Sequence, residues 1–398
     1  MDLTPPGDRI RAVRKRRGLT QRELAAASGL SISWIKKLEQ GDAPDVRLET
    51  LHKLAIALRV PTSSLASGPD AAEPEQSDVD LWKPVRLALA GPASGTGPDE
   101  EPTLAGLRDV FDSTVAALLD SRYSEVRDTL PGLLRDADVL VAVSVNGTER
   151  AARTLRSQVR QLTGYMMGQV WQFDVGRDAM DLALDDASVD KLTAMSAMDW
   201  MCWTMLRQGL LDQARTFASA WADDNEPRMS KASVDELAAW GRFLILISTA
   251  AVRDNRPAEA REALKLARMA AAGIGTEVIP HFNPWQVFGP VTVSMVQAEN
   301  AIIEDRPDIT LAIGERIAGQ QFPLPRNWNR HRLDVASAHV RMKHYPEAVT
   351  VLQGVRAAAP EWLAQQRYAR DILGQVVDRR RTLTDEMRDL ADAVRLPL

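Results

Sequence analysis

The chain has 398 residues, 45% hydrophobic and 26% charged, which is the composition of a soluble globular protein with more than one domain. Its single cysteine, Cys202, excludes an internal disulfide framework and a cysteine metal cluster. No apolar run is long enough to span a membrane, and the basic N-terminus lacks the apolar core of a signal peptide. We therefore expect a cytoplasmic protein without a membrane partner.

Charge is divided unevenly along the chain. Residues 1–68 hold 12 Lys and Arg against 7 Asp and Glu, a net charge of +5, so the remaining residues carry −10 within the total of −5. A basic segment of this kind favours a polyanionic partner. The sequence predicts a basic head that meets a polyanion and an acidic body that does not.

The first predicted elements are two short helices. The stretch DRIRAVRKRRG forms a basic amphipathic helix with Ile10 and Val13 facing inward. Thr20 is a favourable N-cap for the next helix, and Glu23 stands where its capping-box partner is expected. This second helix runs to about Ser28.

A sharp turn and a third helix follow. Gly29 permits the positive φ that the turn requires. Ser31 is the expected cap of the third helix, which ends at Gly41. Ile35 and Leu38 are spaced to be buried on one face of that helix.

Two further helices, at residues 48–60 and 61–67, complete a predicted five-helix head. Restricted residue types occur in it at fixed offsets: Leu19-Thr20-Gln21, Glu23-Leu24-Ala25, Gly29-Leu30-Ser31, Ile35 and Leu38-Glu39-Gln40-Gly41. This pattern resembles the helix-turn-helix of the Cro/C1-type (Xre) repressors over about the first 65 residues. The resemblance implies a lambda-repressor-like DNA-binding domain at residues 1–67, with Arg14 and Glu39 as an internal ion pair.

In such a domain the third helix lies in the major groove with its N-terminal half against base edges. Eight residues are predicted to contact DNA: Gln21, Arg22, Ser31, Ile32, Ser33, Trp34, Lys36 and Lys37. Ile32, Ser33 and Lys37 are the expected base readers, because Lys donates to guanine and an exposed Ile suits a thymine methyl. By the resemblance Gln21 grips a phosphate or a base edge, and the others hold the DNA backbone.

Structural alternatives exist for several of these residues. Ile32 and Trp34 also fit packing on the edge of the domain core, and Lys36 also fits a solvated charge. For the whole head, the alternative is a protein-binding module that uses the same fold.

The head is followed by two stretches rich in Pro, Gly and acidic residues, SGPDAAEPEQSD and PASGTGPDEEP. They have little to bury and are typical of linkers. Between them, residues 79–91 form an apolar island that we expect to be one amphipathic docking helix. Residues 68–102 are therefore predicted to be a linker with a short docking helix, and residues 103–398 a body of continuous helix pairs.

The body repeats weakly. Five segments each combine a turn, a small residue and an amphipathic helix, and the small residues are separated by 38, 46, 50 and 38 positions: Gly176, Ala214, Ala260, Thr310 and Ala348. Small residues there allow two antiparallel helices to approach closely. The pattern resembles lengthened tetratricopeptide (TPR) repeats, which stack into an α-solenoid with a concave surface.

Three stretches of the body, at residues 288–308, 329–349 and 360–374, resemble the TPR-like half of actinobacterial regulators that carry an Xre-type head. Peptide-sensing regulators of Gram-positive bacteria share this layout, and their concave Asn and Arg side chains clamp a peptide backbone. By that analogy the body binds a peptide or small-molecule signal.

Candidates for such a pocket are eight side chains that are costly to bury without use: Trp200, Trp203, Trp285, Asn300, Asn327, Asn329, Arg330 and His331. Packing between helices is the alternative for the tryptophans, and a solvated turn is the alternative for residues 327–331.

Catalytic motifs are not found in the sequence. It has no phosphate-binding loop with its Lys-Ser/Thr, no G-x-S-x-G and no H-E-x-x-H. His331, His339 and His344 share one segment, but the spacing of five splits the last two across helix faces, so surface histidines are expected rather than a metal site. We expect no enzyme activity, no cofactor and no metal.

The sequence as a whole predicts an all-α transcription regulator that binds a palindromic double-stranded operator as a homodimer. A signal bound by the body would then change the spacing of the two heads and so the affinity for DNA. Two alternatives stay open. In one, the body is a protein-interaction scaffold without a small ligand, anchored to DNA by the head. In the other, the head binds protein and no nucleic acid is involved.

Overall fold

The computed structural model describes residues 5–42, 46–66, 76–91, 101–145, 147–187, 190–320, 325–379 and 382–397. In these ranges the regular elements are helices, and the only strand-like pairing is one antiparallel bridge between Val278 and Phe288. The predicted all-α class is confirmed. None of the described helices is both long enough and apolar enough to cross a lipid bilayer.

The helices divide into two compact units. Unit 1 combines Met1–Ala72, Cys202–Glu226 and Phe243–Ala267, and unit 2 holds Glu73–Met201, Pro227–Arg242 and Arg268–Leu398. Unit 1 therefore contains the head together with helices that lie far from it in the sequence.

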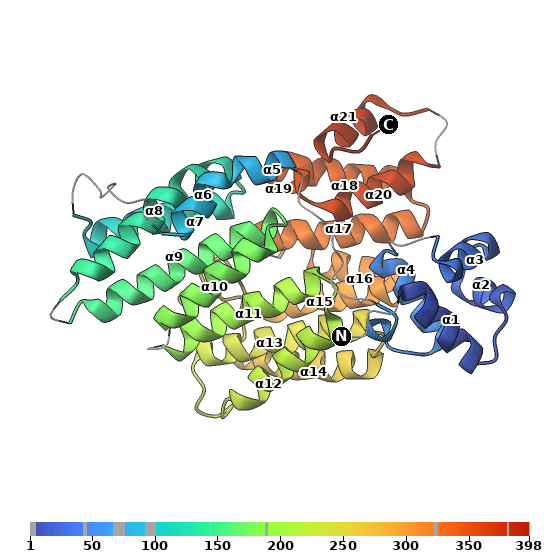
Figure 1. Ribbon diagram of the computed structural model, residues 1–398, viewed down its shortest axis with the longest axis horizontal. Helices are drawn as coiled ribbons and strands as arrows, with labels where there is room; N and C mark the ends of the chain where they lie inside the picture. Colours follow the sequence, from blue (N-terminus) through green and yellow to red (C-terminus); the bar gives the residue numbers. More distant parts are fainter. Residues whose placement is uncertain are drawn as a thin grey trace. The chain divides into compact units, whose positions relative to one another are not determined.

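The head of unit 1 begins with α1 (Pro6–Arg16), α2 (Gln21–Ser28), α3 (Ile32–Gln40) and α4 (Leu48–Leu58), shown in blue in Figure 1. The fifth predicted helix is a single 3₁₀ turn, η1 (Thr62–Ser64). The core of the head holds side chains with no exposed surface, and all four helices contribute to it: Ile10, Leu24, Ile35, Leu38 and Leu54.

The rest of unit 1 comes from the end of α11 (Lys191–Arg207), α12 (Leu211–Asp224), the end of α13 (Val234–Arg253) and the start of α14 (Pro257–Ile274). The turn between α13 and α14, Arg253–Arg256, hydrogen-bonds to the head, and we call it the docking turn. The Thr62 hydroxyl donates to the Arg253 carbonyl at 2.9 Å, and the Ser63 N–H donates to the Asp254 carboxylate at 2.7 Å.

Asn255 of the docking turn and His52 of the head add to this contact. The Asn255 amide donates to the Val60 carbonyl at 3.1 Å, and Nδ1 of His52 lies 2.9 Å from the Arg253 carbonyl. Burial lowers the pKa of His52, although its hydrogen bond to Arg253 opposes the effect. These partners are separated by about 190 to 200 positions, so no local pattern in the sequence indicates them.

Six helical hairpins in the described part of the chain share one kind of turn. They are α7 (Leu104–Leu119) with α8 (Tyr123–Val143), α9 (Glu149–Gln169) with α10 (Phe173–Ala187), α11 (Lys191–Arg207) with α12, α13 with α14, α15 (Pro290–Ile303) with α16 (Pro307–Ile317), and α17 (Pro325–Arg341) with α18 (Tyr345–Ala358). Each turn has one residue with a left-handed backbone: Ser121, Trp171, Gly209, Asn255, Asp305 and Lys343. The next residue donates its N–H to a carbonyl five positions back, which is the closure of a Schellman motif.

The predicted repeat register agrees with these turns. The small residues recognised in the sequence all lie five positions after the left-handed residue and all are buried: Gly176, Ala214, Ala260, Thr310 and Ala348. Their predicted equivalence is confirmed. The hairpin α7–α8 was missed because its residue at that position is Val126, which is buried but not small.

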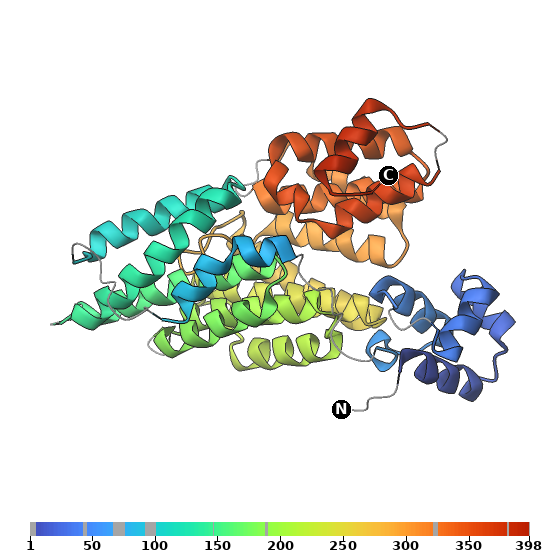
Figure 2. The same cartoon turned by 45° about the horizontal axis from the view of Figure 1, so that its top comes forward.

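Unit 2 is built from neighbouring helices that pack in sequence order. Helix α9 packs on both α8 and α10, and α16 packs on α17. Near the C-terminus, α17 contacts α20 (Arg367–Val377), while α18 contacts α19 (Pro360–Ala364) and α21 (Asp385–Ala393). Helices α17, α18, α20 and α21 lie side by side in both ribbon views, coloured orange to red (Figures 1 and 2).

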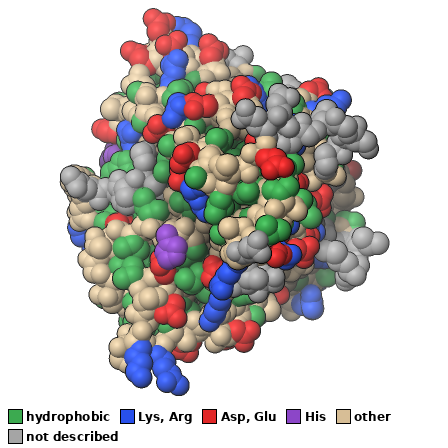
Figure 3. All heavy atoms as spheres, turned by 90° about the vertical axis from the view of Figure 1, so that its left-hand side faces the viewer, with side chains coloured by type: hydrophobic (Ala, Val, Ile, Leu, Met, Phe, Trp, Pro, Cys, Tyr) green, Lys and Arg blue, Asp and Glu red, His purple; other side chains and the backbone are tan. Residues whose placement is uncertain are grey.

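The predicted docking helix at residues 79–91 is two helices, α5 (Gln76–Leu81) and α6 (Lys83–Leu89), separated at Trp82. Helix α6 packs on α8. Residues 68–75 and 92–100 of the predicted linker lie outside the described residues. The face shown in Figure 3 carries acidic and basic side chains interspersed with apolar ones, instead of a surface of one charge.

Candidate nucleic-acid interface

Helix α2 and the turn after it form as the sequence predicts. The Thr20 hydroxyl accepts from the Glu23 N–H at 3.2 Å, and the Thr20 N–H donates to the Glu23 carboxylate at 2.7 Å, which completes the capping box. Gly29 then turns the chain with φ of 70°, in the left-handed region that favours glycine. Ser31 caps α3 by accepting from the Trp34 N–H at 3.2 Å.

Helix α3 has two different faces. Ile35, Leu38 and Glu39 are buried against the other helices of the head. The outward side carries the exposed residues Ser31, Ile32, Ser33, Lys36 and Lys37. Ile32 keeps 41% of its surface exposed, so its aliphatic side chain lies on the outward side beside the serines and lysines.

Packing on the edge of the domain core is the alternative role of both Trp34 and Ile32, but their environments differ. Trp34 is half-buried and packs on the core of the head, which agrees with a residue at the core edge. Ile32 is exposed and is absent from that packing.

A buried ion pair joins α1 to α3. Nε of Arg14 lies 2.6 Å from one Glu39 oxygen and Nη2 lies 2.7 Å from the other, as the resemblance implied. The Gln21 amide also donates to Glu39, at 2.9 Å. Gln21 is predicted from the resemblance to contact DNA, but its amide nitrogen donates to Glu39 inside the domain, whereas its neighbour Arg22 is exposed.

The backbones of α1 and α3 also pack closely against each other. A Cβ atom on Gly7, near the start of α1, would overlap the carbonyl oxygen of Leu38 near the end of α3. Only glycine allows α1 to approach α3 this closely. The sequence offered no signal for this contact, because Gly7 follows two prolines and resembles an ordinary helix start.

The three tryptophans proposed for a signal pocket have different environments. Trp200 is buried with its ring against Gly176, where a Cβ atom would lie 2.7 Å from Cη2. Trp285 is buried, with ring centroids 6.4 Å from Phe111 and 6.3 Å from Tyr165. Trp200 and Trp285 therefore lie in the core of unit 2, which agrees with the alternative role of packing between helices.

Trp203 differs from them because it is half-buried in unit 1, with the Arg207 guanidinium 5.0 Å from its ring centroid. The structure thus assigns the three tryptophans to separate environments.

The polar candidates at residues 327–331 lie in the first turns of α17, so the alternative of a solvated turn was wrong. Asn327 and Arg330 are half-buried, whereas Asn329 and His331 are buried. Arg330 pairs with Asp334 at 2.8 Å and Glu299 at 3.1 Å, and stacks on the Tyr368 ring at 4.7 Å.

Two of these buried side chains have nitrogen atoms without a hydrogen-bond partner. Within the described ranges, Nδ2 of Asn329 and both ring nitrogens of His331 make no hydrogen bond. Burial and the neighbouring Arg330 lower the pKa of His331 to about 4, so the ring is neutral at pH 7. Asn300, the remaining candidate, is buried within α15.

Two expectations about the histidines were wrong. His331 was expected at the surface, but it is buried. His339 and His344 do not lie on opposite helix faces, because α17 ends at Arg341 and the turn at Lys343 folds the chain back. Their ring centroids are 5.8 Å apart.

Residues 7–67 match the family of helix-turn-helix domains. Two curated proteins of Bacillus subtilis (strain 168) are similar: the uncharacterized HTH-type transcriptional regulator RghRB, 38% identical over 76 residues, and the HTH-type transcriptional repressor RghR, 39% identical over 59 residues. These alignments cover 19% and 15% of this chain, which spans about half the length of both relatives, 55% and 44%. No solved structure matches the chain. The family match and the geometry of α2, its turn and α3 agree, and residues 7–67 form a helix-turn-helix domain.

Proposed function

We propose that this protein is a sequence-specific DNA-binding transcription regulator whose helix α3 enters the major groove. The observation that carries the proposal is the pattern of burial along α3. Ile35, Leu38 and Glu39 fix the helix from behind, while Ile32 and Ser33 stay exposed at its amino-terminal end. That end is the part of a recognition helix that meets base edges.

The exposed residues supply complementary chemistry. Ile32 offers an apolar surface for a thymine methyl, and Lys37, one turn further on, offers a donor for guanine O6 or N7. The hydroxyls of Ser31 and Ser33 lie 3.1 Å apart, so they form a polar pair at the helix start. We assign the phosphate contact at the start of α2 to Arg22, because the Gln21 amide is bound to Glu39.

The protein acts as a homodimer in this proposal, because one domain of this size makes few base contacts. Two copies of α3 spaced by one helical turn of DNA, about 34 Å, would read a palindromic operator. The helical hairpins support a TPR-like body, since hairpins that share one turn, five of them with a small buried residue at the same position, are the kind of unit that builds a solenoid. In this proposal the body dimerises and receives a peptide or small-molecule signal. Both relatives are named as transcriptional regulators, which agrees with a role in transcription.

A selection of bound fragments from genomic DNA tests the groove assignment. We expect the full-length chain to enrich one site, and the double variant Ser33→Ala, Lys37→Ala to lose that preference. Each good base contact contributes about 1–3 kcal/mol of discrimination, so the ratio of specific to non-specific affinity should fall at least tenfold.

Two control variants separate readout from charge and fold. Lys36→Ala removes a phosphate contact, so it should weaken binding to all sequences alike and reduce the salt slope by about 1. Lys53→Ala, which lies on α4 in an exposed pair with Glu49, should bind DNA like the unaltered chain. An unchanged site preference of a folded double variant, checked by circular dichroism, would contradict the groove assignment.

A further inference from the structure

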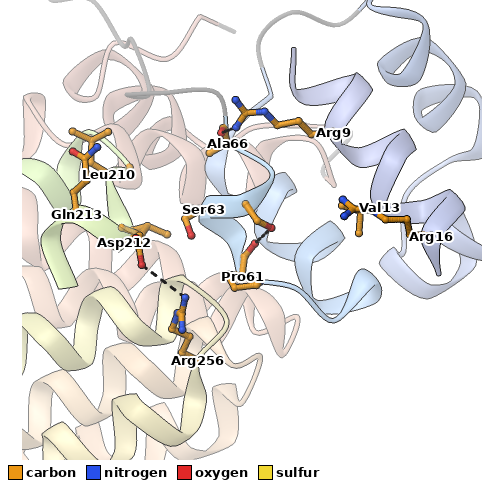
Figure 4. A pocket seen from close by; sticks show the side chains of 13 residues that line it. Arg9, Val13, Arg16, Pro61, Ser63, Ala66, Leu210, Asp212, Gln213 and Arg256 are labelled. Carbon is orange, nitrogen blue, oxygen red and sulfur yellow. Dashed lines mark hydrogen bonds and ion pairs between the residues drawn. The ribbon is translucent and has the colours of Figure 1, made fainter. Parts of the chain in front are cut away.

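A cleft inside unit 1 has no role in the function proposed above. It has a volume of about 600 Å³ and is lined by α1, the 3₁₀ turn η1, the start of α12 and the docking turn. Figure 4 shows Arg9 and Arg16 on the α1 side, Asp212 and Arg256 on the other side, and Pro61 between them. Small-molecule sites in proteins have volumes of about 300–1,000 Å³, so the cleft has the size of such a site.

The lining of this cleft is rich in arginine. Arg9, Arg16 and Arg256 line it, and Asp212 is the single acidic residue in the lining. Arg16 is exposed and makes no hydrogen bond or ion pair with any residue that the structure describes. It is therefore a cation available to a ligand, and a guanidinium is the group best suited to phosphate and carboxylate.

Arg256 is held in place on the opposite side. Its Nε donates to Asp254 of the docking turn at 2.8 Å, and its Nη2 lies 3.8 Å from Asp212. Asp212 is shared, because Arg215 donates to it at 2.7 Å. The two carboxylates therefore orient Arg256 and offset part of its charge, while Arg215 in turn offsets the charge of Asp212.

Two other features of the lining indicate what kind of ligand would fit, one for an anionic group and one for an apolar part. The first turn of α12 opens into the cleft, and its N-cap residue, Leu210, supplies no side-chain cap, so the positive end of the helix dipole faces the space. Val13 and Pro61 add an apolar wall. The site thus suits a molecule with an anionic group and an apolar part.

We propose that this cleft binds a small molecule that bears phosphate or carboxylate groups, which lie between Arg16 and Arg256. The lining comes from the helix-turn-helix domain and from the helical hairpins, so the ligand binds only when the docking turn is seated on the head. Such a ligand stabilises the docked arrangement by mass action. If the protein regulates transcription as proposed above, this ligand is a signal read at the DNA-binding domain itself.

Titration calorimetry of the full-length protein with inorganic pyrophosphate, without DNA and at low salt, tests the site. We expect one saturable site, and at least tenfold weaker binding for Arg16→Gln and for Arg256→Gln, because each removes a charge-assisted hydrogen bond. Lys15→Gln is the matched control: it removes an exposed cation next to Arg16 that does not line the cleft, and it should bind normally.

If Arg256→Gln disturbs the docking turn, Arg16→Gln still tests the site. Replacing Arg16 removes a cation of the lining without breaking a hydrogen bond or ion pair to any described residue. Absence of saturable binding by the unaltered chain, or equal binding by Arg16→Gln and Lys15→Gln, would overturn the proposal. The titration contains no DNA, so its outcome is independent of whether α3 reads an operator.

DNA is a second possible source of phosphate for these arginines. A gel-shift titration with the selected operator, without pyrophosphate, distinguishes the two sources. We expect Arg256→Gln to bind DNA as tightly as the unaltered chain. Weaker DNA binding by Arg256→Gln, together with competition between DNA and pyrophosphate, would assign the cleft to the DNA backbone and overturn the small-molecule proposal.

Discussion

Replacement of Glu39 by alanine is expected to cost the helix-turn-helix domain about 3–5 kcal/mol, because it leaves the Arg14 guanidinium buried without its carboxylate. Both side chains of this pair are almost inaccessible to water, 10% and 2% exposed. Glu39 also accepts from the Gln21 amide, so one substitution removes the acceptor of both the buried Arg14 guanidinium and the half-buried Gln21 side chain. Since the pair joins α1 to α3, the loss should release the recognition helix.

Hydrogen exchange of the full-length chain, followed in peptides that cover α2 and α3, measures this effect without contributions from unit 2. Glu49→Ala is the matched control. Its ion pair with Lys53 is largely exposed, so its loss should cost less than about 1 kcal/mol. The double variant Arg14→Ala, Glu39→Ala should be less destabilised than the sum of the single variants. Protection of α3 in Glu39→Ala equal to that in Glu49→Ala would refute a structural role for the pair.

The same pair predicts acid sensitivity of the domain. Burial would raise the pKa of Glu39, but hydrogen bonds from Arg14 and Gln21 outweigh it and hold the pKa below its usual value. The stabilisation is therefore complete above the unfolded pKa of about 4.3 and is lost as the pH falls through the lower folded value. Exchange protection of α3 should decrease over that acidic range, and Glu39→Gln should remove this part of the pH dependence. If Glu39→Gln and the unaltered chain lose exchange protection over the same acidic range, the acid sensitivity comes from other titrating groups.

Gly241→Ala should be the most damaging small substitution in unit 2. A Cβ atom at this position of α13 would lie 2.5 and 2.6 Å from Cε1 and Cε2 of Phe288 and would overlap Cζ as well. The Phe288 ring is completely buried, so it has no free space into which to move. Overpacking of this kind costs about 1–3 kcal/mol, and a rigid ring places the expected cost at about 3 kcal/mol.

Thermal denaturation followed by circular dichroism, with Gly132→Ala as the control, tests this expectation. Gly132 also lies inside a helix, α8, but a Cβ atom there would have no neighbour within 4 Å. Alanine at that site should be neutral or stabilise by up to about 1 kcal/mol, because it favours the helix. Equal melting temperatures for the two variants would mean that the Phe288 ring moves aside at little cost, and would contradict the prediction.

The parts of the fold that the sequence predicted correctly depend on neighbours within a few residues. The Thr20–Glu23 capping box, the turn at Gly29 and the Ser31 cap are local hydrogen bonds with strong residue preferences. The hairpin register followed from small residues placed at a fixed distance after each turn. Burial of Ile35 and Leu38 followed from helical spacing alone.

Other features depend on residues that are distant in the sequence, and no local pattern reports them. The docking turn pairs Asp254 with Ser63, and Gly7 is needed because of Leu38. The hydrogen bond of Gln21 to Glu39 was missed because the resemblance implied a DNA contact for Gln21, and its acceptor, Glu39, comes from another helix. The proximity of His339 and His344 depended on where α17 ends, and helix ends are the least predictable boundaries.

The docking turn also has a consequence for the order of events during synthesis. Its hydrogen bond from Ser63 to Asp254 joins residues 191 positions apart. A ribosome adds about 5–20 residues per second, so the helix-turn-helix domain emerges roughly 10–40 s before the turn that holds it exists. Because the contacts of its own core lie within the first 66 residues, the domain can fold in that interval. Each new copy of the protein therefore passes through a period in which its DNA-binding domain is folded but not yet docked.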